Sequence, residues 1–157
     1  MSTSALSFTV ELRSDPLPDD QREALLSNPG FGKTFTDHMS LATWTSGRGW
    51  HDAKVTAYGP LSLYPSAAVL HYAQEIFEGM KAYRHADGSV WTFRPEANAA
   101  RFARSAGRLA LPELPPTDFI ESIRALVATD EKWVPGGDTE EASLYLRPFM
   151  FASESFL

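Results

Sequence analysis

The sequence predicts an α+β domain in which a mainly antiparallel sheet packs against two or three helices. Three observations indicate this class. Strand-like runs come as hairpins, helical patterns are inserted between the hairpins, and no steady alternation of strand and helix occurs. A length of 157 residues, with 43% hydrophobic and 22% charged residues, is enough for one domain with its own core.

Residues 1–30 are expected to form an N-terminal arm that lies over this core. The arm is polar and rich in Asp and Pro, and only residues 20–26 suit a short helix. From residue 31 onward the pattern changes to that of a strand, which a turn at residues 46–49 joins to a second strand. A hairpin is therefore predicted here.

Three helices are predicted in the remainder of the chain. The first begins at Pro65 and ends near Gly79, the second spans residues 95–109, and the third has Thr117 as its N-cap. Apolar residues recur at helical spacing in the first helix (Val69, Ala73, Ile76, Phe77, Met80) and in the third (Phe119, Ile120, Ile123, Leu126, Val127).

Two more strand regions complete the prediction. Asp87-Gly88 lies between two β-prone runs and predicts a second hairpin. The last strand covers residues 144–151, and its alternation puts four side chains on one face: Tyr145, Arg147, Phe149 and Phe151. The sequence stops directly after this apolar strand with no polar tail, so we expect the chain to be part of a longer protein.

Composition and charge exclude several functional classes. The net charge of −6 and the isoelectric point near 5.1 argue against a nucleic-acid partner or an anionic lipid surface. The absence of cysteine excludes disulfides, thiol nucleophiles and zinc fingers. No apolar run approaches the length of a membrane helix and no signal peptide is visible, so we expect a cytoplasmic protein without a membrane partner.

Arg147 is the first candidate for chemistry. A guanidinium in an apolar strand is costly to bury unless an anionic or strongly accepting group meets it. Together with Tyr145 and Phe149 on the same face, it suits a pocket for a ligand that carries a carboxylate. The alternative is an arginine at a strand end that pairs with a surface glutamate.

The other candidate clusters are weaker. Arg101, Arg104 and Arg108 share one face of the predicted second helix, which can hold a phosphate or form a solvated surface. Glu75 and Glu78 are expected to face solvent on the first helix. Two further motifs are not expected to carry chemistry: Asp37-His38, whose side chains should point to opposite faces of a strand, and Gly47-Arg48-Gly49, which lacks the third glycine and the helix of a phosphate loop.

The residues themselves resemble a known family. Five blocks occur in the same order in the branched-chain amino acid aminotransferases, which are fold-type IV enzymes that depend on pyridoxal 5′-phosphate. These blocks begin at Phe31-Gly32-Lys33-Thr34-Phe35, Leu70-His71-Tyr72-Ala73-Gln74, Phe93-Arg94-Pro95, Trp133-Val134-Pro135 and Leu144-Tyr145-Leu146-Arg147-Pro148. The match covers residue 31 to the end of the chain and implies the small, N-terminal domain of such an enzyme.

The resemblance implies a role for individual residues. Arg101 corresponds to the arginine that binds the cofactor's 5′-phosphate in the family. Aromatic walls suit branched aliphatic side chains, and an arginine suits the second carboxylate of glutamate or 2-oxoglutarate. The implied substrate-binding residues are Phe31, Tyr72, Phe77, Tyr145 and Arg147, and in a homodimer Tyr72 could face the site of the neighbouring subunit.

The same resemblance implies that no catalytic residue lies in this chain. No metal site is expected either, because His51, His71 and His85 are scattered without ligand spacing. The family takes its Schiff-base lysine from the second domain, and none of the four lysines here (Lys33, Lys54, Lys81, Lys132) occupies that position. We therefore expect the 157-residue chain to be inactive alone. Two alternatives stay open: another fold-type IV enzyme, such as a D-amino acid aminotransferase or an aminodeoxychorismate lyase, and a non-catalytic domain that binds or dimerises by itself.

Overall fold

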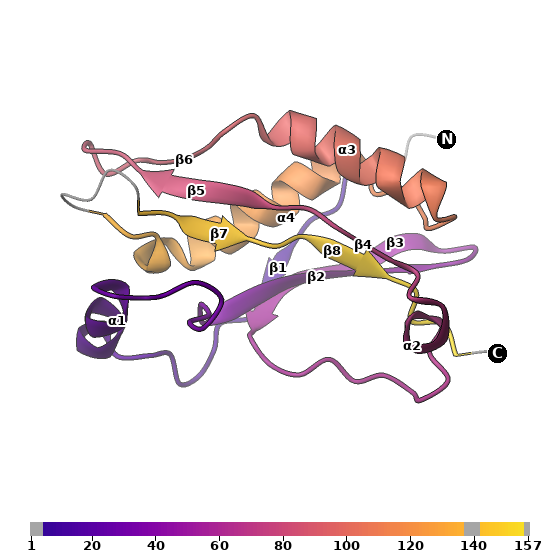
Figure 1. Cartoon of the computed structure of the whole chain (residues 1–157), viewed down its shortest axis with the longest axis horizontal. Helices are drawn as coiled ribbons and strands as arrows, with labels where there is room; N and C mark the ends of the chain where they lie inside the picture. The colour runs from indigo at the N-terminus through magenta and orange to yellow at the C-terminus, as the bar shows by residue number, and fades with distance from the viewer. Residues whose placement is uncertain (1–4, 137–141, 156–157) are drawn as a thin grey trace.

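The computed structural model describes residues 5–136 and 142–155 of the chain (Figure 1). Four α-helices and one 3₁₀ turn lie among eight short strands. The helices are α1 (Asp19–Leu26), α2 (Ala68–Tyr72), α3 (Pro95–Arg108) and α4 (Pro116–Thr129), and the turn is Glu131–Trp133. The strands are β1 (Thr9–Val10), β2 (His38–Thr45), β3 (Gly49–Ala57), β4 (Glu75–Phe77), β5 (Met80–Arg84), β6 (Val90–Thr92), β7 (Leu144–Leu146) and β8 (Phe149–Phe151).

The strands form three small sheets, in the orders β1-β3-β2, β4-β8 and β6-β5-β7. Every pair is antiparallel except β1 with β3. Both predicted hairpins are present, as β2–β3 and β5–β6, and the α+β class with a mainly antiparallel sheet is confirmed. Residues 5–30 also contact the body of the chain, because β1 pairs with β3 and Leu6 packs against the core.

One core joins α3 and α4 to the two sheets that contain β4, β5 and β7. Phe102 and Phe119 meet at its centre with their ring centroids 5.2 Å apart, and Ile76, Ala82 and Leu146 pack against them from the strands. Figure 1 shows α3 along the upper edge and α4 behind β5 and β7. No helix within the described residues is long and apolar enough to cross a membrane.

The predicted N-cap of α4 is wrong by two residues. Pro115 precedes the helix and Pro116 is its first residue, so Thr117 already lies in the first turn. Proline suits this place because its φ angle is preset for a helix and its missing N–H group would have had no partner there.

The predicted helix between residues 65 and 80 is also wrong beyond Tyr72. Ala73 has φ = 51° and ends α2 in the left-handed conformation. The following residues form β4, which pairs with β8, and β5, which pairs with β6 and β7. Pairing with strands distant in sequence therefore replaces the helix that the local apolar spacing favours.

The predicted strand at residues 144–151 divides in two at Arg147 and Pro148. β7 pairs with β5, whereas β8 pairs with β4. Alternation along these strands turns Ile76, Met80 and Leu146 into the core. It also turns a second set of side chains to the opposite, outer face of the two sheets: Phe77, Lys81, Tyr145 and Phe149.

Candidate functional site

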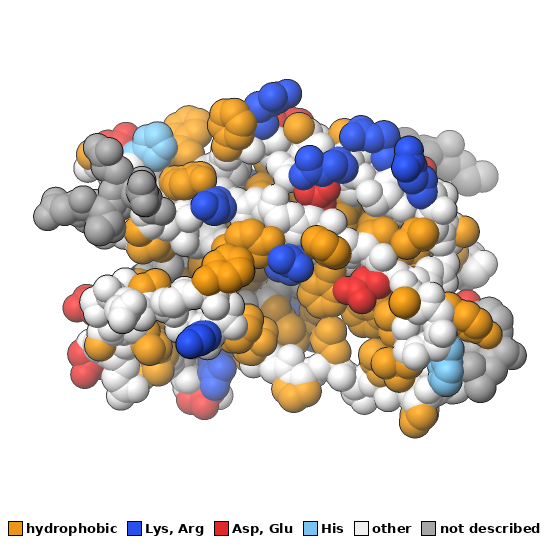
Figure 2. Space-filling model, in the orientation of Figure 1, with side chains coloured by type: hydrophobic (Ala, Val, Ile, Leu, Met, Phe, Trp, Pro, Cys, Tyr) orange, Lys and Arg blue, Asp and Glu red, His pale blue; other side chains and the backbone are white. Residues whose placement is uncertain are grey.

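Four of the five predicted substrate residues meet on this outer face. We call Phe31, Phe77, Tyr145 and Arg147 the aromatic–arginine cluster. Phe31 comes from the loop before β2 and lies edge-on to Tyr145, with ring centroids 5.4 Å apart. The guanidinium carbon of Arg147 lies 4.6 Å from the centre of the Phe77 ring. Figure 2 shows apolar side chains gathered over these strands around isolated basic groups.

Arg147 is held by aromatic groups and a phenol. Its Nε and Nη2 atoms donate to Tyr145 Oη over 3.1 and 2.9 Å. The side chain is exposed, so the cost of burial considered from the sequence does not arise. No carboxylate within the described residues lies at ion-pair distance from it, so none of these residues is the surface glutamate partner of the alternative reading. Its Nη1 group makes no hydrogen bond to residues 5–136 or 142–155 and suits an incoming carboxylate.

Gly79 allows Tyr145 to lie in this place. A Cβ atom at residue 79 would be 2.5 Å from Tyr145 Oη and 3.3 Å from its Cζ atom. Any larger residue would therefore move the phenol that holds Arg147. The glycine of the Phe77-Glu78-Gly79 segment is required by close approach, and not by the end of a helix as the sequence suggested.

The fifth predicted residue stands apart. Tyr72 lies on α2 with 62% of its surface exposed, and the only aromatic ring paired with it in the described part of the chain is that of His71, 6.4 Å away. Lys81, by contrast, is opposite Tyr145 in the β5–β7 pair and shares the outer face with the cluster. The structure thus brings together four of the predicted substrate residues and leaves Tyr72 separate.

Arg101 forms a two-point ion pair with Glu78. Its Nε atom lies 2.6 Å from Oε1 and its Nη2 atom 2.7 Å from Oε2, while Asn98 donates to Oε2 over 3.0 Å. Glu78 is only 4% exposed, so the expectation of a solvent-facing helical glutamate is wrong. The residue lies outside any helix, in the two-residue connection between β4 and β5.

This ion pair also shifts the titration of both groups. The hydrogen bond from Arg101 is the main reason why the pKa of Glu78 lies below its usual value, and it outweighs the opposite effect of burial. The same bond raises the pKa of Arg101. Both groups are therefore charged at neutral pH.

The three arginines of α3 do share one face, as their spacing predicts. Arg101, Arg104 and Arg108 line a hollow of about 240 Å³ together with Ser105. Neither Arg104 nor Arg108 forms an ion pair with a carboxylate in residues 5–136 and 142–155. A hydroxyl and several guanidinium N–H groups around one open hollow form a donor set that fits a phosphate dianion.

Glu78 and Gly79 join this hollow to the aromatic–arginine cluster. The backbone N–H of Glu78 donates to the carbonyl of Pro148 over 2.8 Å, next to Arg147. The carbonyl of Gly79 accepts a bond from Asn98 of α3 over 3.2 Å. The arginine-lined hollow and the aromatic–arginine cluster are therefore attached to the same two residues.

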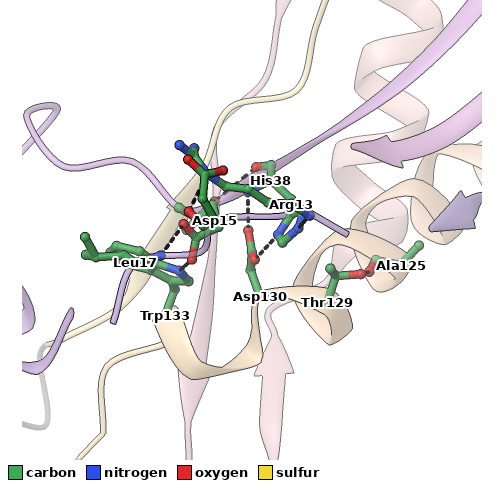
Figure 3. A network of polar contacts seen from close by, with 10 residues as sticks. Arg13, Asp15, Leu17, His38, Ala125, Thr129, Asp130 and Trp133 are labelled. Carbon is green, nitrogen blue, oxygen red and sulfur yellow. Dashed lines mark hydrogen bonds and ion pairs between the residues drawn. The ribbon is translucent and has the colours of Figure 1, made fainter. Parts of the chain in front are cut away.

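Asp37 and His38 belong to a separate polar network, which Figure 3 shows around His38, Asp130 and Trp133. The backbone N–H of Arg13 donates to His38 Nε2 over 2.9 Å, so Nδ1 carries the proton and donates to Asp130 over 2.6 Å. Asp37 accepts from Trp133 Nε1 over 2.8 Å. The prediction of a structural histidine is consistent with these contacts, but the two residues share one network because Asp37 precedes the strand. No cluster of three metal-ligating side chains occurs among the described residues.

Comparison with known proteins shows which proteins this chain is similar to. No protein-family model matches the chain. It is 60% identical over 154 residues to a branched-chain-amino-acid aminotransferase of Mycolicibacterium smegmatis, covering 98% of this chain and 42% of that protein. It is 63% identical over 148 residues to a probable one of Streptomyces coelicolor, covering 93% of this chain and 41% of that protein.

Solved structures support the fold. The branched-chain aminotransferase of Escherichia coli matches with a TM-score of 0.52 at 20% identity, over 64% of this chain and 30% of that one. That of Thermoproteus uzoniensis, solved with norvaline, matches with a TM-score of 0.53 at 21% identity, over 75% of this chain and 35% of that one. By its sequence, the chain is therefore similar to branched-chain aminotransferases, and it spans about 42% of the length of such a relative.

Proposed function

We propose that this chain is the small-domain part of a branched-chain amino acid aminotransferase. The complete enzyme would depend on pyridoxal 5′-phosphate and move an amino group between leucine, isoleucine or valine and 2-oxoglutarate. It would act as a cytoplasmic homodimer in branched-chain amino acid biosynthesis. The observation that carries this proposal is the junction at Glu78 and Gly79, which attaches an arginine-lined hollow to an aromatic–arginine cluster.

The aromatic–arginine cluster would receive the substrate. The rings of Phe31, Phe77 and Tyr145 offer apolar walls for a branched aliphatic side chain. Arg147 is held against two of these rings, so its Nη1 group, which no described residue engages, can bind the second carboxylate of glutamate or 2-oxoglutarate without first being ordered. One pocket would then serve both halves of the exchange.

The hollow on α3 would hold the phosphate of the cofactor. Arg101 would supply N–H donors and positive charge, and its place between Glu78 and the hollow fits that role. The cofactor, when bound, supplies an electron sink for the bond changes at the amino acid's α-carbon. This chain's part is to bind and orient both molecules.

We propose that the lysine that carries the cofactor lies in a second domain, after the arm (1–30) and the small domain (31–157). Two of the lysines present are engaged elsewhere, Lys54 with Glu11 over 3.0 Å and Lys132 with Asp19 over 3.3 Å. Lys81 lies near the cluster, but its block in the family carries no covalent link. Reduction with borohydride in the presence of cofactor should therefore label none of the four lysines of this chain.

Cofactor titration into the complete enzyme tests the proposal. We expect Arg101→Ala to weaken retention of pyridoxal 5′-phosphate by about 10- to 100-fold, because a charge-assisted bond to phosphate is lost. Arg124→Ala is the matched control, since Arg124 is an exposed helical arginine that pairs with Glu121. Equal retention in both variants would contradict the assignment. A panel of branched, D- and aromatic substrates separates this enzyme from other fold-type IV enzymes.

A further inference from the structure

Glu78 differs from the other carboxylates that pair with arginine or lysine. It is 4% exposed, whereas its partner Arg101 has 59% of its side-chain surface exposed. A buried carboxylate is costly unless its oxygens are satisfied. Here Oε1 accepts from Arg101, and Oε2 accepts from both Arg101 and Asn98. The Glu78 carboxylate is thus held in place by three hydrogen bonds, and the side chain of Arg101 extends from it toward the surface.

The geometry of the pair leaves one end of Arg101 free. A guanidinium has five N–H donors. Glu78 takes the edge formed by Nε and Nη2, and the Nη1 group makes no hydrogen bond within the part of the chain that the structure describes. Arg101 also lines the hollow that it shares with Arg104, Ser105 and Arg108. Fixing one edge of the guanidinium therefore fixes the direction of the donors that face this hollow.

We propose that Glu78 is a positioning residue: it holds Arg101 so that the guanidinium is already oriented for the cofactor's phosphate. This inference rests on the proposed function and adds a residue to it. Two effects oppose each other here. The negative charge of Glu78 repels a phosphate, whereas an ordered arginine loses less conformational freedom when it binds. The direct two-point contact and the two arginines in the hollow without a carboxylate partner in the described residues favour orientation as the larger effect.

The test compares pyridoxal 5′-phosphate with pyridoxal, which lacks only the phosphate. The affinities of both are measured by equilibrium dialysis on the complete apoenzyme, and their ratio isolates the phosphate contribution. We expect Glu78→Gln to lower this ratio about tenfold, although the substitution removes a negative charge. Glu75→Gln is the matched control, because Glu75 is an exposed carboxylate on the neighbouring strand β4. Its ratio should stay within about twofold of wild type.

Two further variants make the result decisive. Arg101→Ala should lower the ratio at least as much as Glu78→Gln, and the double variant should match Arg101→Ala alone, since Glu78 acts through Arg101. Glu78→Asp keeps the charge but is too short to hold both Nε and Nη2, so it too should lower the ratio. This variant replaces Glu78→Gln if the latter does not fold.

The outcomes separate the two proposals. If Arg101→Ala leaves the ratio unchanged, the phosphate assignment fails and the role of Glu78 fails with it. If Arg101→Ala lowers the ratio while Glu78→Gln raises it or leaves it unchanged, only the positioning role is overturned. An equal loss of affinity for both ligands in Glu78→Gln would mean a structural role alone and would also overturn it.

Discussion

Glu78 makes the stability of this chain depend on pH. Its pKa lies below the ordinary value of 4.5, mainly because of the hydrogen bond from Arg101. A carboxyl whose pKa is lower in the folded than in the unfolded state stabilises the fold above the unfolded pKa, and this stabilisation disappears as the pH falls through the folded pKa. The contribution should therefore be complete near neutral pH and disappear in acid.

We expect the difference in unfolding free energy between wild type and Glu78→Gln to be constant between about pH 6 and 8 and to decrease steadily below about pH 4.5. Urea unfolding at a series of pH values from 7 down to 3 measures it. Glu75→Gln serves as the control, with no comparable pH-dependent difference. A Glu78→Gln difference that stays constant down to pH 3 would contradict the ion pair as the source.

At the scale of residues, the sequence predicted which side chains contact each other better than it predicted which side chains are buried. The alternation in residues 144–151 places Tyr145 beside Arg147, and the contact between them has this origin. Glu78 was assigned to solvent because helical spacing was assumed for residues 65–80. Its burial depends on α3 approaching β4 from the other side of a hairpin, and no local pattern contains that contact. The signal that was available is the conflict between Gly79 and a helix interior.

At the scale of elements, helix α3 ends with an alanine in an unfavourable conformation. Ala110 has φ = 53°. The N–H of Leu111 donates to the carbonyl of Ala106 over 3.0 Å, and the N–H of Ala110 donates to that of Gly107 over 3.4 Å. This is the Schellman arrangement, in which glycine usually occupies the place of Ala110 because it has no Cβ atom.

We expect Ala110→Gly to stabilise the chain by about 0.5–1 kcal/mol, because the strain of a left-handed alanine exceeds the entropy that glycine gains in the unfolded state. Ala97→Gly is the control of opposite sign. Ala97 is exposed inside α3, so glycine there should destabilise by about 0.5–1 kcal/mol. Both values come from urea unfolding at pH 7. If the two variants shift stability in the same direction, the strain at Ala110 is not the cause.

The sequence could predict the elements that depend on local patterns, but not those that depend on distant pairing or on a left-handed alanine. Helices α3 and α4 and the hairpins β2–β3 and β5–β6 depend on local periodicity and turn residues, and they appear near their predicted positions. Helix α2 ends at Tyr72 because Ala73 adopts a left-handed conformation. The sequence does not predict this end, because the position holds neither of the residues that favour the conformation, glycine or asparagine. Strands β4 and β8 form because they pair across 72 or more residues of sequence, beyond the reach of a local pattern.

At the scale of the whole molecule, the face with the candidate site carries exposed aromatic side chains. Phe31 is 77% exposed and Phe77 63%. Apolar patches of this kind usually mark an interaction surface. Since the chain spans about 42% of a relative, the face supports the proposal that the rest of the enzyme covers it and completes the pocket.

The N-terminal arm is joined to the body of the molecule through Asp130. Its Oδ1 accepts from His38 Nδ1 over 2.6 Å and its Oδ2 from the backbone N–H of His38 over 2.9 Å, and His38 in turn accepts from Arg13 of the arm.

Asp130→Asn keeps the shape of the side chain but turns one acceptor into a donor, which must then face an N–H group. We expect a loss of about 1–3 kcal/mol in unfolding free energy, together with faster proteolysis of the arm near Arg13. Asp20→Asn, an exposed carboxylate on α1, should change neither quantity. Unchanged proteolysis in a destabilised Asp130→Asn variant would mean that the network supports the core without fastening the arm.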